Sequence, residues 1–357
     1  MITIRAATSP GEIRIAVFDD DILQDLCLWR PGRPDGIGDV YRARITAHLP
    51  GMAGAFLSLP DRDGFLPDSE GGAGALEGAL LTVRITRAGQ GGKGARLSAK
   101  LPQTEGPPGL VARGPNPIEL FAAQHPGAPI EVDDPALAAE LRRHAPTIAP
   151  VDLDDIIDTL AARQTDLPGG MRATFEPTQA LVAIDLDMAA ATQGRQAKPA
   201  AQLAANLAAL PELARQIRLR NLSGAIFVDP AGMSTQRRPL LAQALAAALA
   251  SDPLHPHLLG FTKLGLAEIV RPRIRPPLHE LLRGPHAAAL AALRTIARES
   301  AATPHATLGL TAAPDVINAL DQDDVALADL ARRTGRPLIP KPEPALPPGI
   351  WRIERRA

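Results

Sequence analysis

The sequence predicts an α/β multidomain protein that contains a small β-barrel. In the first 100 residues, apolar and polar side chains alternate in short runs broken by Gly, Pro and Asp, which is typical of β-strands. After residue 167, apolar runs of strand length alternate with helical patterns, which favours a sheet flanked by helices. The chain of 357 residues is long enough for roughly two or three such units.

The β-rich start divides into two predicted parts. Residues 1–30 predict a hairpin or meander, because Ile13, Ile15 and Val17 face one way and the residues between them face the other. Residues 36–100 predict about five further strands, which indicate a small barrel, a fold that in one form binds oligonucleotides.

The rest of the chain predicts a connector followed by α/β structure. Residues 101–150 are rich in Pro and Gly and predict one helix, from Pro135 to Arg143. The elements expected next are strands at 180–187, 225–229 and 258–261, with helices at 202–220 and 239–250. Pro211 is expected to kink or break the first of these helices. From about residue 284 we expect a small α/β domain with strands at 306–310, 338–339 and 350–353.

Charge is unevenly distributed although the net charge is only −1. Residues 213–275 hold nine Lys or Arg and three Asp or Glu, whereas residues 101–166 hold four Arg and eleven Asp or Glu. The basic segment favours a polyanionic partner, and the alternative is a set of solvated helix faces.

The single cysteine, Cys27, excludes an internal disulfide framework and a Cys-rich zinc module. The chain starts without a charged leader followed by an apolar core, and its Ala/Leu stretches are typical of soluble helices. We therefore expect a cytoplasmic protein without a membrane partner.

Aspartates stand at the polar ends of two predicted strands. Asp185 and Asp187 end the first apolar run, and Asp229 ends the second. The carboxyl ends of strands are where α/β sheets place ligand-binding groups, so two carboxylates meeting there indicate a magnesium site. The alternative for each is turn formation or helix capping after a strand.

Four stretches in this order resemble the ribonuclease E/G family of bacterial endoribonucleases. They are Asp39–Ile45 with Leu49–Phe56 and Gly64–Pro67; Gly92–Leu97; Leu167–Gly170 through Thr178 to Asp185; and Ala214–Leu222 with Ile226–Asp229, Met233 and Lys263–Leu266.

The resemblance implies a particular layout. An S1-type (OB-fold) RNA-binding barrel, residues 36–100, would be inserted in a split ribonuclease H-like α/β unit, residues 1–35 plus 101–166. A deoxyribonuclease I-like α/β catalytic domain, residues 167–283, and a small C-terminal α/β domain, residues 284–357, would follow.

The resemblance also implies an RNA-processing endoribonuclease that cleaves single-stranded RNA. Asp185 and Asp229 match the family's aspartates that hold Mg²⁺, for which Mn²⁺ can substitute. The metal would activate a water that hydrolyses the phosphodiester and leaves a 5′-phosphate and a 3′-hydroxyl.

RNA contacts are implied on two surfaces. Phe56 and Phe65 match the barrel aromatics that stack on bases, although either ring could instead belong to the barrel core, and Lys93 would contact the backbone. The phosphate path to the metal would be lined by basic residues whose alternative role is salt-bridged or solvated surface. They are Arg215, Arg218, Arg220, Lys263, Arg271 and Arg273.

Three positions depart from the family pattern. Asp187 replaces a common Asn and could supply a third metal ligand or repel the other two carboxylates. Gln179 and Gly232 stand where acidic residues are usual, and we expect both to remove negative charge near the site. These changes keep open a second function, a catalytically impaired RNA-binding relative that acts as an adaptor or competitor.

Two features of the family are not expected here. The segment of residues 101–150 matches the family's 5′-monophosphate sensor in position, but it is short and acidic and contains no Arg-Thr pair. We therefore predict no 5′-end sensing. The zinc-link cysteines are replaced by a segment containing His279 and His286, which we interpret as surface residues rather than ligands, so no zinc is expected. A homodimer, if formed, would use apolar contacts or the C-terminal domain.

Overall fold

The computed structural model describes residues 1–188 and 199–356, and the chain divides into two compact units. The first comprises Met1–Leu153 with Glu280–Ala357, and the second comprises Asp154–His279. Within the described ranges, no helix has the length and apolar character needed to cross a membrane.

The N-terminal sheet of the first unit has the strand order β11-β10-β1-β2-β3. Its strands are β1 (Ile2–Ser9), β2 (Glu12–Asp19), β3 (Ile22–Trp29), β10 (Ile130–Val132) and β11 (Thr147–Ile148). The first three form the predicted meander, and β10 pairs with β1 in parallel, with Ile4 opposite Ile130. The chain therefore leaves this sheet to form the barrel and then returns to it.

The predicted connector holds more structure than its sequence indicated. It contains β9 (Gly109–Ala112), α1 (Pro117–Gln124) and α2 (Pro135–Glu140) in addition to β10 and β11. Helix α1 begins with a capping box, in which Asn116 and Glu119 bond each other's backbone N–H. The expectation of a single helix was therefore wrong, because a short capped helix produces little periodicity.

The predicted small barrel is confirmed. Its strands are β4 (Val40–Leu49), β5 (Gly54–Ser58), β6 (Asp63–Pro67), β7 (Leu80–Arg87) and β8 (Ala95–Ser98), with β9 added at the edge. Pairing of β5 with β4 closes the five-stranded barrel, as expected for an OB-like fold. Alternating inward residues, among them Ile45, Leu57 and Leu66, fill its core.

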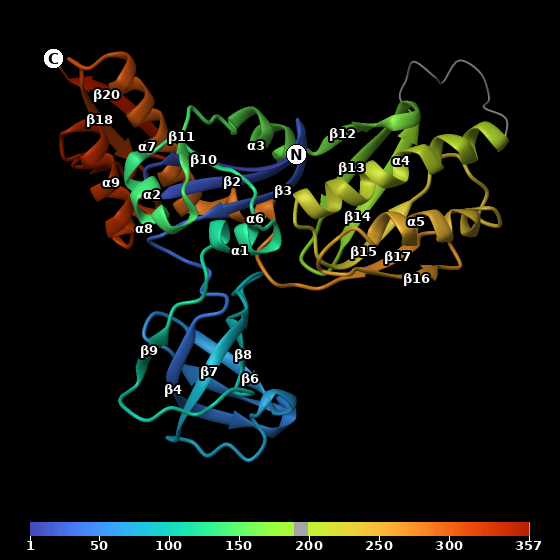
Figure 1. Cartoon of the computed structure of the whole chain (residues 1–357), viewed down its shortest axis with the longest axis horizontal. Coiled ribbons are helices and arrows are strands. Elements are labelled where there is room, and N and C mark those ends of the chain that lie inside the picture. Colours follow the sequence, from blue (N-terminus) through green and yellow to red (C-terminus); the bar gives the residue numbers. More distant parts are fainter. Residues whose placement is uncertain (189–198, 357) are drawn as a thin grey trace. The chain divides into compact units, whose positions relative to one another are not determined.

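The second unit is built on a six-stranded sheet with the order β12-β13-β14-β15-β17-β16. Its elements are α3 (Asp154–Ala161), β12 (Gln164–Leu167), β13 (Met171–Pro177), β14 (Val182–Met188), α4 (Pro199–Leu219), β15 (Gly224–Asp229), α5 (Ala242–Leu249), β16 (His257–Phe261) and β17 (Ala267–Arg271). Helices α4 and α5 cover the same face of the sheet, and their apolar residues share one core with the strands (Figure 1).

Two expectations for this unit were wrong. Helix α4 continues through Pro211, so the break considered for this position does not occur, because the loss of one backbone hydrogen bond is offset by the buried face formed by Leu210, Leu213 and Ile217. Strand β17 was not anticipated as a strand, yet it lies between β15 and β16 and pairs with both in antiparallel fashion.

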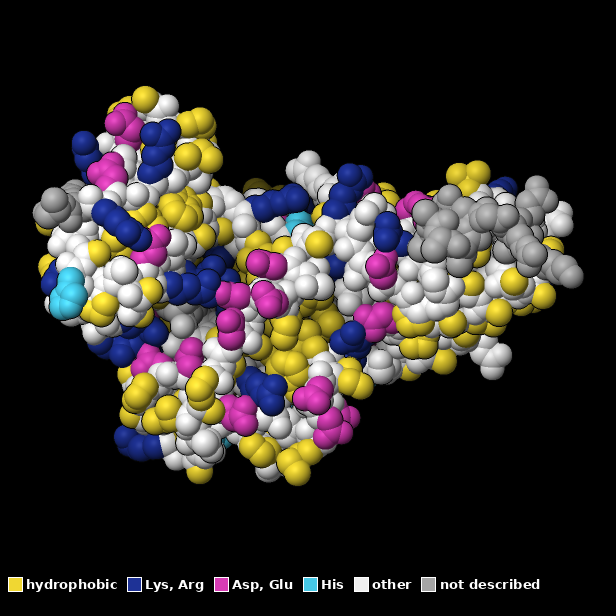
Figure 2. Space-filling model, turned by 90° about the horizontal axis from the view of Figure 1, so that it is seen from above, with side chains coloured by type: hydrophobic (Ala, Val, Ile, Leu, Met, Phe, Trp, Pro, Cys, Tyr) yellow, Lys and Arg dark blue, Asp and Glu magenta, His cyan; other side chains and the backbone are white. Residues whose placement is uncertain are grey.

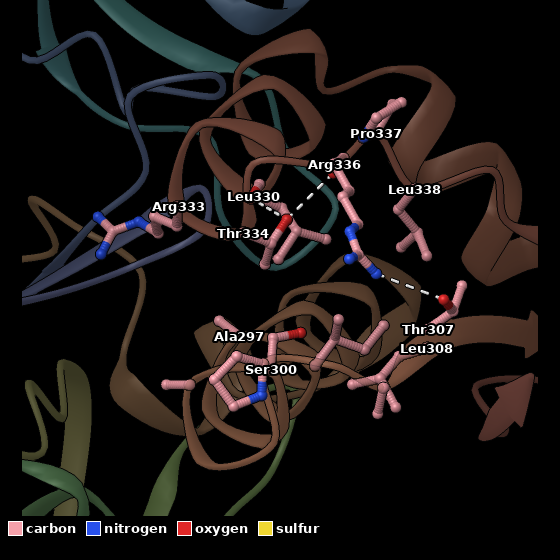
Figure 3. A pocket seen from close by; sticks show the side chains of 14 residues that line it. Ala297, Ser300, Thr307, Leu308, Leu330, Arg333, Thr334, Arg336, Pro337 and Leu338 are labelled. Atoms are coloured by element: carbon pink, nitrogen blue, oxygen red, sulfur yellow. Dashed lines mark hydrogen bonds between the residues drawn. The ribbon is translucent and has the colours of Figure 1, made fainter.

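The C-terminal part of the first unit is a small α/β layer. It comprises α6 (Leu278–Leu281), which begins at the boundary of the second unit, α7 (Gly284–Ala302), β18 (Thr307–Ala312), α8 (Pro314–Asp321), α9 (Asp324–Thr334), β19 (Lys341–Pro342) and β20 (Trp351–Arg356). The strand expected at 338–339 lies instead at β19. A cavity of about 300 Å³ opens beside α7 and α9, with Arg336 reaching across it to Thr307 (Figure 3).

Candidate metal centre and nucleic-acid interface

Asp185 and Asp229 lie opposite each other on neighbouring parallel strands. The register of β14 and β15 pairs Asp185 with Asp229. Ile184 and Val228 precede them and point into the core, each 1% exposed, so both aspartates point to the opposite face of the sheet. Adjacent strands lie about 4.8 Å apart, so the two carboxylates can converge on one cation.

The chain segment after Asp229 is fixed from the helical side by Asn206 on α4. This buried side chain donates to the carbonyl oxygen of Ala231 at 3.0 Å and accepts from its N–H at 3.1 Å. A carboxamide that satisfies both backbone groups holds the turn in one conformation. Sequence reasoning missed this residue, although an Asn within the Ala/Leu-rich pattern of a buried helix face was an available signal.

Burial and nearby negative charge both act on the carboxyl group of Asp185. The pKa of Asp185 is raised, first by burial and then by the negative charge of Asp187, a hydrogen bond with Asp187, and the charge of Asp229. Asp187 lies two residues along the same strand face. The interaction of Asp187 with Asp185 corresponds to the repulsive alternative weighed from the sequence.

Asp229 also has a cationic neighbour. The Nη1 atom of Arg238 lies 2.7 Å from the Oδ1 atom of Asp229 in an ion pair. Arg238 belongs to the 3-10 turn η6 (Arg238–Leu241) that precedes α5, and sequence reasoning did not single it out.

The donor set fits Mg²⁺, although it is not a preformed multidentate cage. Within residues 1–188 and 199–356, no group of three or more His, Cys, Asp or Glu side chains is arranged to hold a metal ion. Mg²⁺ takes few protein carboxylates and keeps several waters, so a pair of aspartates meets its preference. Burial and, after it, the neighbouring negative charges raise the pKa of Asp185, and a bound dication would favour its charged form. The role of Asp187 as a third ligand stays a prediction.

Of the two histidines expected at the surface, His286 forms a specific contact within the fold. Its Nε2 atom lies 2.7 Å from the Oδ2 atom of Asp323, whose other oxygen accepts from the N–H of Ala326 and caps α9. His286 is therefore part of the packing around α9.

The two barrel phenylalanines form one half-buried aromatic pair. Phe56 on β5 is opposite Phe65 on β6, and their rings meet edge to face at 5.3 Å between centroids. Both side chains are only partly buried, and neither belongs to the core cluster of the barrel. This position leaves them able to stack on bases. Lys93 is exposed in the turn between β7 and β8.

The predicted basic path contains residues in different environments. Lys263 is exposed in the turn between β16 and β17, and the guanidinium of Arg273 lies over Gly224. Arg215 is paired with Glu212 at 2.7 Å, and Arg218 donates to the carbonyl oxygen of Ser251. Figure 2 shows basic and acidic side chains intermixed on the face that it views.

Arg271 and Arg220 do not line a surface. Arg271 is 3% exposed and forms an ion pair with Asp252 at 2.7 Å. Arg220 is buried beneath the ring of Phe175 and donates to two carbonyl oxygens of the α3–β12 segment, and burial lowers its pKa to about 10. The expectation that these two arginines contact RNA is corrected, because the folded chain uses their guanidinium groups internally.

Comparisons with known proteins match the segment that carries both aspartates. The sequence model described as "Ribonuclease E/G family" matches residues 130–274. Ribonuclease E of Nostoc sp. is 37% identical over 119 residues, which is 33% of this chain and 17% of that protein. Ribonuclease G of Salmonella typhimurium is 23% identical over 395 residues, which is 77% of this chain and 80% of that protein. Over residues 130–274 the chain is therefore similar to the ribonuclease E/G family.

The share of the relative's length that this chain covers differs from one relative to another. Ribonuclease E of Haemophilus influenzae is 23% identical over 77% of this chain. The match covers only 42% of the length of the Haemophilus protein. The chain thus spans less than half of these ribonuclease E relatives, whereas it spans most of the ribonuclease G of Salmonella.

The three departures from the ribonuclease E/G pattern lie at different places. Asp187 interacts with Asp185, as described above. Gly232 lies in the turn after Asp229 with a φ of 64°, close to Gln202. Gln179 is exposed in the hairpin turn between β13 and β14, at the end of β14 away from Asp187. The expectation that Gln179 removes charge near the site was therefore wrong.

Proposed function

We propose that this protein is a Mg²⁺-dependent endoribonuclease that cleaves single-stranded RNA. The observation that carries the proposal is the direct pairing of Asp185 with Asp229 on the outer face of adjacent parallel strands, within the segment that matches the ribonuclease E/G family. The names of its relatives, ribonuclease E and ribonuclease G, support the same class of reaction. Along with the activity we propose the family's layout, with a ribonuclease H-like N-terminal sheet and a deoxyribonuclease I-like catalytic sheet.

In this mechanism each group has a separate task. Asp185 and Asp229 would hold Mg²⁺, or Mn²⁺ in its place, without zinc. The cation would supply an activated water and neutralise negative charge that develops on the scissile phosphate. Lys263 and Arg273 would attract the phosphates on either side, and Phe56 and Phe65 would stack on unpaired bases. We expect a 5′-phosphate and a 3′-hydroxyl, and no preference for a 5′-monophosphate.

Incubation of an A/U-rich single-stranded RNA with the full chain tests the proposal. We expect fragments to form in Mg²⁺ and not in EDTA, at equal rates for 5′-hydroxyl and 5′-monophosphate substrates. Mapping the fragment ends checks the chemistry. Cleavage that persists in EDTA, or products that end in a 2′,3′-cyclic phosphate, would contradict the mechanism.

A second candidate is an RNA-binding relative that no longer cleaves and acts as an adaptor or competitor. The interaction of Asp187 with Asp185 favours it, because a third carboxylate can hold Asp185 away from a cation. RNA binding in Mg²⁺ without fragment formation, unaltered in Asp185→Asn, would establish this candidate in place of the first.

The aromatic pair yields a prediction about affinity. Phe56→Ala and Phe65→Ala should each weaken binding of single-stranded RNA about 10-fold, because a stacked base contributes about 1–3 kcal/mol. The barrel should keep its stability, since both rings lie outside its core. Leu49→Ala, which removes another exposed apolar side chain from the barrel, is the matched control. Fluorescence anisotropy with labelled RNA measures the effect, and equal affinities for all these variants would exclude stacking at this pair.

A further inference from the structure

The ion pair between Arg238 and Asp229 divides the Asp229 carboxylate into two unequal halves. The Oδ1 atom lies 2.7 Å from the Nη1 atom of Arg238 and is shielded from solvent, and within the described residues it accepts no hydrogen bond, so the contact is an ion pair and not a hydrogen bond. The Asp229 side chain as a whole is 46% exposed. Because Oδ1 is shielded, the solvent-exposed surface lies on the side of the carboxylate that faces away from Arg238. One oxygen is thus turned toward Arg238, and the other side remains accessible to a cation.

The guanidinium of Arg238 is itself held by the backbone of two loops. Its Nε atom donates to the carbonyl oxygen of Met233 at 3.0 Å, and Nη1 donates to the carbonyl oxygens of Gly265 at 3.2 Å and Leu264 at 3.5 Å. The side chain is 15% exposed. Backbone acceptors on both sides restrict the rotamers of this otherwise flexible side chain, so its position relative to Asp229 is fixed.

Gly265 provides the space through which Arg238 passes. Its φ is 85°, and a Cβ atom added there would lie 2.6 Å from the Cδ atom of Arg238. A side chain at this position would strain the turn and displace Arg238. The glycine in the turn between β16 and β17 therefore leaves room for the Arg238 side chain. This observation does not depend on the ion pair between Arg238 and Asp229.

We propose that Arg238 is a positioning residue for the metal ligand Asp229, an inference that rests on the proposed function. Arg238 fixes one carboxylate oxygen and presents the other to the cation, as outer partners of metal ligands commonly do. Its contacts with Leu264 and Gly265 also join the Asp229 carboxylate to the turn that carries Lys263. The metal position and a phosphate contact are thereby held in one arrangement.

A simple electrostatic role would have the opposite effect on metal binding. If the charge of Arg238 only repelled the cation, its removal would strengthen metal binding. If Arg238 orients Asp229, its removal weakens binding, and the effect requires the Asp229 carboxylate. The sign of the change and its dependence on Asp229 separate the two roles.

Isothermal titration of Mn²⁺ into the full-length protein tests the inference without reference to cleavage. Arg238→Ala should weaken Mn²⁺ binding about 10- to 100-fold. The double variant Arg238→Ala with Asp229→Asn should bind no more weakly than Asp229→Asn alone, because both changes act on one ligand. Methylguanidinium should restore part of the affinity of Arg238→Ala. Arg237→Ala, which removes the neighbouring charge, is the matched control and should bind Mn²⁺ normally.

Gly265→Ala provides a second variant that retains the guanidinium, and it should also weaken Mn²⁺ binding, with the fold checked by circular dichroism. If Arg238→Ala does not fold, Gly265→Ala takes its place as the variant that tests the inference. Unchanged or tighter binding by the folded variants, or additive effects in the double variant, would overturn the inference while leaving the proposed function intact. A wild-type protein that binds no Mn²⁺ would overturn the proposed function and the inference together.

Discussion

Asp185→Asn and Asp229→Asn should each lower the rate of metal-dependent RNA cleavage by about 10³-fold, because a metal ion contributes several kcal/mol to such a reaction. Each substitution preserves side-chain volume and removes one anionic ligand. Asp185 lies on the outer face of the sheet, outside the core, so Asp185→Asn should retain the fold. Single-turnover cleavage at saturating RNA measures the loss.

Asp166→Asn is the matched control for these variants. It removes an exposed carboxylate from β12 of the same sheet, where Asp166 pairs with Arg172, and it should cleave at the wild-type rate. RNA affinity should be unchanged in Asp185→Asn, since the barrel and Lys263 are untouched. Wild-type cleavage by both ligand variants would show that the reaction takes place elsewhere.

Arg271→Met should lower the free energy of unfolding by about 3–5 kcal/mol, because it leaves the buried carboxylate of Asp252 without its partner. Both side chains are 4% exposed, and Arg271 also donates to Asn221 and to the carbonyl oxygen of Leu222. The loss should be local to β15, β16 and β17. Hydrogen exchange followed by mass spectrometry reports on these strands separately from the other unit.

Arg273→Met offers a control only two residues away. Arg273 is only partly buried and lies over Gly224, so its replacement should change stability little and weaken RNA binding instead. If Arg271→Met folded normally but lost RNA affinity, Arg271 would belong to the RNA path and its ion pair with Asp252 would not be needed for stability.

The pairing of Asp185 with Asp229 was predictable because its signal is local. An apolar run that ends in Asp indicates a strand tip, and parallel strands bring such tips to one edge. The residues that position the pair were not predictable in this way. Asn206 and Arg238 act through backbone carbonyls of loops distant in sequence, and β17 pairs within the sheet through contacts that no periodicity reveals.

The number of arginines is known from the sequence, but the environment of each arginine could not be predicted from it. Lys263 and Arg271 belong to the same basic segment, yet one is exposed and the other pairs with Asp252 inside the fold. Burial depends on which acidic residue the tertiary structure brings near. The barrel, by contrast, was predictable because its strands are consecutive and alternate cleanly, whereas the pairing of β1 with β10 joins segments on either side of it.

Crystals of the full chain grown with Mn²⁺ and measured at the manganese absorption edge would test the central claim most directly. We predict an anomalous peak between the carboxylates of Asp185 and Asp229, on the sheet face opposite α4 and α5, with Arg238 still paired to the remaining oxygen of Asp229. A peak elsewhere in the molecule, or none at Mn²⁺ concentrations that support cleavage, would contradict it.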